Sequence, residues 1–366
     1  MGRGGGVGAS GPQSGGAGAS GPRLGGMYGP DITFLGVPRA DLADPGSWAG
    51  TEVLIIGAPF DGGTSHRPGA RFGPQAIRST DYLPHDGARP HLALGVDPLA
   101  ELRVADAGDV EMPSGETQAS LASLEQAVQA ACQAGAFPVI LGGDHTITLP
   151  DATGTARHVG WGRLSLIHFD AHADTGDTQF GSLYGHGTPM RRLIESGAVR
   201  GDRFLQIGLR GYWPEPPVLA WMAEQRMRSF EMSEIVTRGL GECLTEALAI
   251  SVDECDGVFL SVDVDVVDPG MAPGTGTPEP GGLTARQLLD AVRRIAMSVP
   301  LTGIDVVEVA PPYDHAEITA FLANRVVLEA LSGIAWRRRR AALPATEPGH
   351  VPETPLLSGR GGPEAG

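Results

Sequence analysis

The sequence predicts an α/β protein with a single doubly wound, mostly parallel sheet and helices on both of its faces. Short apolar runs rich in β-branched residues alternate with helical patterns along the chain. Nearly continuous apolar strands are typical of a sheet whose two faces are both covered, and strand–helix alternation favours parallel order. The 366 residues, 41% of them hydrophobic, are enough for one large domain with a sizeable core.

Seven strands and three of the helices between them can be placed from these patterns. The predicted strands are Val53–Gly57, Leu102–Ala107, Phe137–Leu141, Leu164–Phe169, Phe204–Leu209, Val258–Val264 and Thr302–Val309. The predicted helices are Glu116–Ala134, Ser233–Ile250 and Thr284–Met297.

The two ends of the chain differ in composition from the middle. Residues 1–30 are rich in glycine and residues 341–366 in proline, glycine and glutamate, so neither end can bury enough apolar surface to fold. We expect two disordered tails around a catalytic domain at 31–340, with Met27 as an alternative start.

Charge and cysteine usage restrict the class of protein. The formal net charge is −16, and all 27 basic residues are arginine. This balance disfavours nucleic-acid partners and favours small cationic ligands. Because we find neither a signal peptide nor a run of about 18 apolar residues, we expect a cytoplasmic protein without membrane partners. The irregularly spaced cysteines Cys132, Cys243 and Cys255 indicate no disulfide framework.

Four segments place acidic or imidazole side chains just after a predicted strand. They are Gly142–His145, His168–Asp174, Ser261–Pro269 and Asp305–Asp314. In an open α/β sheet, ligands bind outside the carboxyl ends of the strands, so residues far apart in sequence would converge there. A lone Asp-x-Asp or GGDH segment would be explained at least as readily by a turn or a helix cap, whereas the DAHAD run is harder to explain in this way. The occurrence of all four at strand ends favours a binding site.

The residue types at these strand ends predict a metal site. In extended backbone Asp170, His172 and Asp174 would all face one side, and Asp263 and Asp265 repeat this spacing. With His145 they give four carboxylates and two imidazoles, a donor set that suits Mn²⁺ before Zn²⁺. Four negative charges at one site are too costly without cations, and two divalent ions would neutralise them.

The motifs at these strand ends carry a family resemblance. GGDHTITLP, HFDAHAD, DVVEVAPPYD and SVDVDVVDP with APGTGTPEPGGLT resemble the signature segments of the ureohydrolase (arginase/agmatinase) family. The resemblance runs from about Val53 to about Ala335 and includes PFDGGTSHRPGARFGPQAIR. It implies an arginase-like fold, two Mn²⁺ per subunit, and a homo-oligomer that is a trimer or a hexamer.

The resemblance also assigns the metal ligands. One Mn²⁺ would be held by His145, Asp170, Asp174 and Asp263. The second would be held by Asp170, His172, Asp263 and Asp265. Asp170 and Asp263 would therefore bridge the two ions.

Three further residues match functional positions of the family. Glu308 matches the glutamate that pairs with the substrate guanidinium, and Thr277 lies where a threonine supports it. His186 matches a histidine that exchanges protons with water, and the ligand Asp174 would pass a proton to the leaving amine. Two metals would lower the pKa of a bound water toward about 7. The reaction expected from the resemblance is hydrolysis of a linear guanidino compound to urea and a primary amine.

The remote end of the substrate is less well specified. Arginases carry an asparagine where this sequence has Gly176, which disfavours arginine itself. Asp177 favours the ammonium of agmatine, whereas Gln179, Arg191 or Arg192 would suit the carboxylate of 4-guanidinobutanoate. We expect agmatine, hydrolysed to putrescine, with a guanidino-acid hydrolase as the alternative. A zinc-dependent deacetylase-like hydrolase is an alternative of another class.

Some nearby positions remain open between two roles. His66 and Arg71 follow the first strand and would either line the site or stabilise their loop. His168 would lie in the core or support the ligands from behind. The segments Thr175–Tyr184 and Arg78–Leu83 are expected around the mouth of the site.

Overall fold

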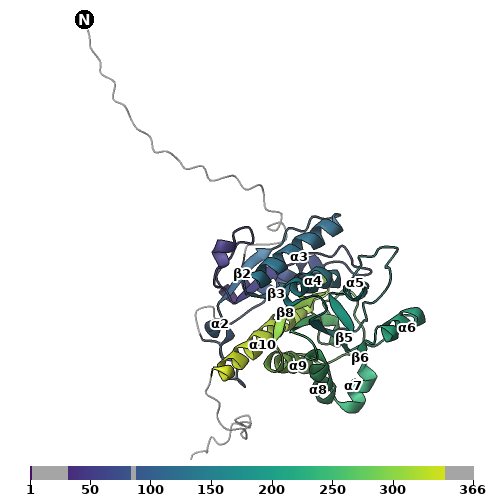
Figure 1. Ribbon diagram of the computed structural model, residues 1–366. Helices are drawn as coiled ribbons and strands as arrows, with labels where there is room; N and C mark the ends of the chain where they lie inside the picture. Colours follow the sequence, from purple (N-terminus) through teal and green to yellow (C-terminus); the bar gives the residue numbers. More distant parts are fainter. Residues whose placement is uncertain (2–31, 84–87, 343–366) are drawn as a thin grey trace, which may run out of the picture.

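Eight parallel strands form one sheet in the order β2-β1-β3-β8-β7-β4-β5-β6 (Figure 1). This is the predicted doubly wound architecture, and it is confirmed. The strands are β1 (Val53–Gly57), β2 (Val104–Asp109), β3 (Phe137–Leu141), β4 (Leu164–Phe169), β5 (Val199–Ile207), β6 (Arg228–Phe230), β7 (Gly257–Asp263) and β8 (Leu301–Val307).

The computed structural model describes Met1, residues 32–83 and residues 88–342. Nearly all of the two expected tails, and Met27 with them, lie outside the described residues. The last helix ends at Ala341, one residue beyond the predicted end of the domain. The described helices are α1 (Gly73–Ser79), α2 (Pro98–Glu101), α3 (Thr117–Gln133), α4 (Thr148–Val159), α5 (Pro189–Ser196), α6 (Pro216–Glu224), α7 (Met232–Arg238), α8 (Leu240–Ser251), α9 (Ala285–Ser298) and α10 (Ile318–Ala341).

Apolar side chains fill both faces of the sheet. In β1, Val53 and Ile55 belong to one buried cluster, and the alternating Leu54 and Ile56 belong to another. Because successive side chains of a strand point to opposite faces, a strand covered on both sides must be apolar throughout. Helices α3 and α4 lie on one side of the sheet and α8, α9 and α10 on the other (Figure 1).

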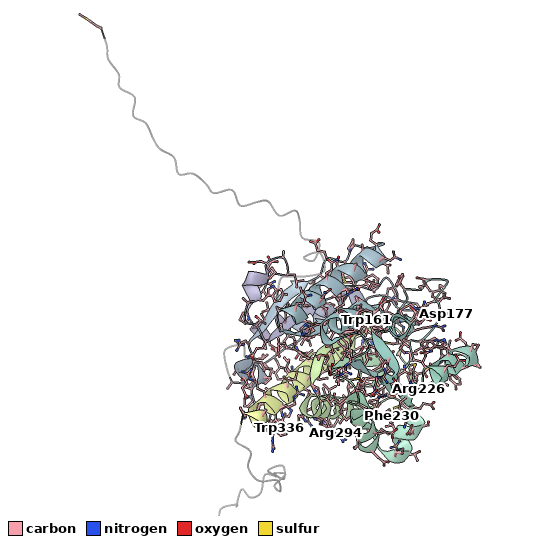
Figure 2. All side chains as sticks on the ribbon, viewed as in Figure 1. Trp161, Asp177, Arg226, Phe230, Arg294 and Trp336 are labelled. Carbon is pink, nitrogen blue, oxygen red and sulfur yellow. The ribbon has the colours of Figure 1, made fainter. Side chains whose placement is uncertain are left out.

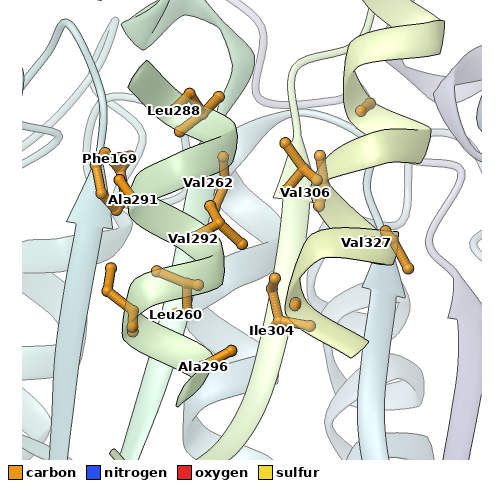
Figure 3. Close-up of a cluster of buried hydrophobic side chains, with 14 of the residues drawn as sticks. Phe169, Leu260, Val262, Leu288, Ala291, Val292, Ala296, Ile304, Val306 and Val327 are labelled. Atoms are coloured by element: carbon orange, nitrogen blue, oxygen red, sulfur yellow. The ribbon is translucent and has the colours of Figure 1, made fainter. Parts of the chain in front are cut away.

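Helices α9 and α10 cover the centre of the sheet. Val292 of α9 and Val327 of α10 face Ile304 of β8 and its neighbours in a continuous apolar cluster (Figure 3). Of the described helices, only the one spanning His315–Ala341 is long and apolar enough to cross a membrane. Its most apolar stretch of 18 residues has a mean hydropathy of 1.4, and 72% of that stretch is buried inside the protein. A core helix of a globular domain has this character.

Several elements differ from the predicted bounds, and three of the differences have a local reason. The predicted helix Ser233–Ile250 is two helices, because Gly239 between α7 and α8 has a φ of +87° that a helix cannot contain. The short strand β6 was missed, since three residues carry too little periodicity. Strand β8 ends at Val307 because the next residue, Glu308, has a φ of +64°.

Candidate metal centre

The four motif segments follow four strands that are neighbours in the middle of the sheet. These strands are β3, β8, β7 and β4, which lie side by side in that order. All four run in the same direction, so their carboxyl ends lie at one edge. The side chains that follow them are thereby gathered at one place, as expected for an open α/β sheet.

His145 lies at the centre of a carboxylate cluster. Its Nδ1 atom is 2.9 Å from Asp170 Oδ2, 3.1 Å from Asp174 Oδ2 and 3.1 Å from Asp263 Oδ2. The ring is buried, and its Nε2 atom lies 2.9 Å from the hydroxyl of Ser261, which fixes the ring orientation. One imidazole nitrogen and three carboxylate oxygens thus converge on one point.

Asp170 is shared between this cluster and a second one. Its Oδ2 atom faces His145, while its Oδ1 atom lies 3.4 Å from Nδ1 of His172. The same His172 nitrogen is 3.0 Å from Oδ2 of Asp265. Each oxygen of the Asp170 carboxylate therefore faces a different imidazole, the arrangement that a bridging ligand requires.

The backbone brings these residues together in a different way from the extended conformation that we predicted. Strand β4 ends at Phe169, and Asp174 has a φ of +52°, in the left-handed region. Asp265 lies in the 3₁₀ turn Val264–Val266, whose first residue is preceded by the capping residue Asp263. The Asp265 amide donates to Asp263 Oδ1 at 2.8 Å. Turns after the strands, and not the pleat of the strands, aim the side chains.

The charges of the cluster match a site for cations. Burial lowers the pKa of His145, but hydrogen bonds to Asp170, Asp174 and Asp263 outweigh burial and hold it well above its usual range. Burial, together with the charges of Asp265 and Asp170, raises the pKa of Asp263 well above its usual range. A positive charge at the centre of the cluster would therefore stabilise its carboxylates. Oxygen and imidazole donors are the ligands of hard and borderline divalent ions, so the residues fit such a site.

Side chains behind the cluster hold the ligands in place, and sequence reasoning did not identify most of them. His168, left open between two roles, is fully buried with its Nε2 atom 2.9 Å from Asp170 Oδ2. Gln206 of β5 donates to the Ala173 carbonyl at 2.7 Å and contacts His168. Ser261 and Gln206 lie inside predicted strands, where a polar residue in an apolar run was the available signal.

Glu308 and His186 form a buried pair beside the cluster. His186 Nδ1 is 2.8 Å from Glu308 Oε1, and the same oxygen accepts the backbone N–H of His145 at 2.9 Å. Among the described residues, Glu308 Oε2 is buried and has no hydrogen-bond partner. Burial lowers the pKa of His186, but the Glu308 carboxylate outweighs it and raises that pKa to about 9.

The loop after β1 reaches this pair through a residue that we did not predict. Ser65 Oγ lies 2.7 Å from His186 Nε2. The neighbouring His66 is exposed, and Arg71 pairs with Asp61, which makes Arg71 a loop-stabilising residue. The expectation that the segment starting at Arg78 lies at the mouth is wrong for Arg78 itself, because it is buried in ion pairs with two aspartates of β2.

A cavity of about 330 Å³ opens over the cluster. Its size lies at the lower end of the range for small-molecule sites. Gln179 and Thr277, both predicted to bind substrate, line it, and the Thr277 hydroxyl lies 3.5 Å from Asp265 Oδ2. The lining residues are Ser65, His172, Asp174, Thr178, Gln179, Phe180, His186, Gly187, Trp213, Asp263 and Thr277.

Asp177 does not reach this cavity. It lies at the surface (Figure 2), where its carboxylate is 3.3 Å from Arg192 and 3.5 Å from Arg191. Arg191 and Arg192 also pair with Glu195, and they are absent from the cavity lining. The three charged residues that we expected to choose between an ammonium and a carboxylate therefore pair with one another and with Glu195 outside the cavity.

The chain is similar to known proteins over most of its length. The Arginase family model matches residues 51–333. Guanidinopropionase of Pseudomonas aeruginosa is 39% identical, with 85% of this chain and 93% of that protein covered. The mitochondrial agmatinase of Gallus gallus is 38% identical, with 77% and 81% covered.

Another relative has also been solved structurally. Proclavaminate amidinohydrolase of Streptomyces clavuligerus is 37% identical in sequence, with 84% of this chain and 94% of that protein covered. Its structure superimposes with a TM-score of 0.76 at 35% identity, covering 86% of this chain and 99% of that chain.

Proposed function

This chain belongs to the arginase family, and from that premise we propose that it is a two-manganese amidinohydrolase that releases urea from a linear guanidino compound. The observation that carries the proposal is the position of Asp170, whose two oxygens face two different imidazoles. A carboxylate in that position suits a pair of cations better than a single one. The relatives' names support hydrolysis of C–N bonds in amidines as the reaction class.

In this proposal six residues hold the two ions. His145, Asp174 and one oxygen of Asp170 would bind the first, and His172, Asp265 and the other oxygen would bind the second, with Asp263 between them. Mn²⁺ suits a set of four carboxylates and two imidazoles. When bound, the pair supplies a water of lowered pKa and Lewis-acid stabilisation of developing charge.

The chain's own residues would orient the substrate. The unpartnered Glu308 Oε2 is suited to accept a charge-assisted hydrogen bond from the guanidinium. The other Glu308 oxygen is held by His186 and by the His145 amide, so the carboxylate is fixed before substrate arrives. Fixing the guanidinium carbon in this way lowers the entropic part of the barrier.

Proton movement would involve Asp174 and His186. Water adds to the guanidinium carbon, the bond to the substituted nitrogen breaks, and the leaving nitrogen takes up both protons of the water. The products are neutral urea and an alkylammonium ion, so charge is conserved. Asp174 lies in the cavity lining and is suited to carry the proton, while His186 is linked through Ser65 to the outer part of the cavity.

Agmatine, giving putrescine, is the substrate that we propose, and 4-guanidinobutanoate is the alternative within the same reaction. The net charge of −16 favours the approach of a dication over that of a zwitterion. We further propose a cytoplasmic protein that assembles as a trimer or hexamer.

The test is urea release by manganese-loaded protein from agmatine, 4-guanidinobutanoate, 3-guanidinopropanoate and arginine at several salt concentrations. We expect about two Mn²⁺ per subunit and the highest kcat/KM for agmatine. One zinc per subunit, with acetate released from an acylated amine and no urea from any guanidine, would reject the proposal in favour of a deacetylase-like hydrolase. Urea release with a preference for 4-guanidinobutanoate at low salt would keep the reaction and reject agmatine.

A further inference from the structure

Two aromatic side chains stand at the outer wall of the cavity. Phe180 and Trp213 line it, yet Phe180 is 88% exposed and Trp213 is 38% exposed. They come from separate loops, the first before His186 and the second after β5. Exposed aromatic surface costs free energy in water, and at a cavity mouth it is typical of a surface that a ligand covers.

The backbone presents Phe180 at the tip of a tight hairpin. Gln179 and Ser182 exchange two backbone hydrogen bonds of 2.8 and 2.9 Å. The two residues between them, Phe180 and Gly181, have φ angles of +51° and +81°. Such a two-residue turn requires positive φ at both central positions, where asparagine and glycine are usual and a phenylalanine is strained. Core packing does not account for the phenylalanine, because the ring is exposed.

The hairpin is anchored to the site. The side-chain oxygen of Gln179 accepts the Gly187 amide at 2.9 Å, next to His186. A side chain on Gly185 would collide with Gln179, since a Cβ atom there would lie 2.2 Å from the same oxygen. The ring of Phe180 is therefore carried on a segment that is tied to the proton-handling residue.

Trp213 lies beside Gly176. The indole Cζ2 atom lies 3.4 Å from where a Gly176 Cβ would be, which is an ordinary van der Waals distance. The indole edge therefore lies next to the Gly176 backbone, and the residue lines the cavity.

The charge of the outer wall limits what can bind there. Apart from the imidazoles near the floor, the described residues that line the cavity include no basic side chain, and the wall offers only neutral groups beside the two rings. A carboxylate moved from water to such a wall would lose hydration without an ionic partner. An ammonium gains from the face of an aromatic ring, and methylenes gain from contact with it.

We propose that Phe180 and Trp213 bind the remote end of the substrate, and that this end carries an ammonium or an uncharged alkyl group and no carboxylate. The inference rests on the proposed amidinohydrolase activity. It adds the residues that select the substrate and the class of substrate that they accept.

The test compares four guanidines in the manganese-loaded full chain: agmatine, butylguanidine, 4-guanidinobutanoate, and methylguanidine, which is too short to reach the rings. Phe180→Gly removes the ring and relaxes the turn, so a loss cannot come from a broken hairpin. Trp213→Leu removes the indole, and Trp213→Phe keeps an aromatic face. Tyr212→Ala is the matched control, because Tyr212 is a fully exposed aromatic residue beside Trp213 that does not line the cavity.

We expect wild-type protein to prefer agmatine and butylguanidine over 4-guanidinobutanoate. Phe180→Gly and Trp213→Leu should raise KM for agmatine about tenfold, the effect of a partly desolvated cation–π contact. Their kcat and kcat/KM for methylguanidine should equal those of wild type, as should metal content. Trp213→Phe should recover most of the loss.

Three outcomes would overturn the inference. They are a wild-type preference for 4-guanidinobutanoate, losses in Phe180→Gly and Trp213→Leu no larger than that in Tyr212→Ala, or equal losses on methylguanidine. Failure of the proposed function would look different, because no variant and no wild-type sample would release urea from any of the four compounds.

Discussion

His186 and Glu308 are joined by a contact of 2.8 Å between Nδ1 and Oε1, which leaves the other oxygen of Glu308 buried and unpartnered. A buried carboxylate oxygen without a partner costs free energy unless a ligand meets it. In the proposed function, one oxygen of Glu308 is therefore an internal anchor and the other would bind the guanidinium.

Replacing the Glu308 carboxylate tests whether it binds the guanidinium. We expect Glu308→Gln to keep its metal content and to lose at least about 10–100-fold in kcat/KM, because a charge-assisted hydrogen bond becomes a neutral one. Urea release and metal analysis on the same sample measure both. Glu329→Gln is the matched control, since Glu329 of α10 pairs with Arg293 of α9 and with His91 and does not line the cavity. Activity of Glu308→Gln close to that of the control would show that the guanidinium binds elsewhere.

Asp170 and His145 should differ in their effect on metal content. Asp170 faces both imidazoles, so Asp170→Asn should lose both ions, whereas His145→Asn should retain about one of the two. Metal stoichiometry after dialysis measures the difference. Asp268→Asn, in the same acidic segment, is the control, because its carboxylate accepts backbone amides of Gly270 and Gly281. Equal metal loss in Asp170→Asn and His145→Asn would contradict a bridging Asp170.

Arginine should be a poor substrate, and restoring the asparagine should not correct this. A Cβ atom on Gly176 would lie 2.9 Å from the Gly187 carbonyl oxygen, which is too close without a shift of the backbone. Gly176→Asn should therefore destabilise the fold by about 1–3 kcal/mol, which lowers Tm by several degrees, without gaining activity on arginine. Gly181→Asn serves as control, because that position has positive φ and open space around a Cβ. A stable Gly176→Asn protein that cleaves arginine would refute this account.

Asp151 on α4 should give a pH-dependent stability difference. It is fully buried, and among the described residues neither of its oxygens has a hydrogen-bond partner. Burial, and then the charge of Asp305, raise the pKa of Asp151 well above its usual range. In the unfolded chain this carboxyl ionises at about pH 4. The folded state therefore loses stability relative to the unfolded state as pH rises from that value to the higher pKa of Asp151 in the folded protein.

Asp151→Asn removes that penalty. Its Tm should exceed that of wild type, and the advantage should grow from pH 5 to pH 8, reaching a few degrees in a domain of this size. Thermal melts at fixed manganese concentration across this range measure it. An advantage that shrinks with rising pH would mean that Asp151 is ionised in the folded protein and has a partner.

The sheet, its parallel order and the strand ends at which polar residues converge could all be predicted from the sequence. Apolar runs covered on both faces leave little choice of conformation, and GGDH and HFDAHAD follow such runs directly. The direction in which each side chain points could not be predicted from the sequence, because turns after β4 and β7 replace the extended backbone that the two-residue spacing implied.

The sequence predicted only part of the mouth of the cavity. Asp177 is acidic and close in sequence to the ligands, yet contacts with Arg191 and Arg192 hold it at the surface. The segment Thr175–Tyr184, which contains Phe180, was expected at the mouth and lines the cavity, but nothing in the sequence predicted that Trp213 from another loop would line it as well. The local sequence pattern predicts helices and strands, because these depend on backbone preference and burial. Substrate selectivity at the mouth of the cavity depends on which loops the folded chain brings together.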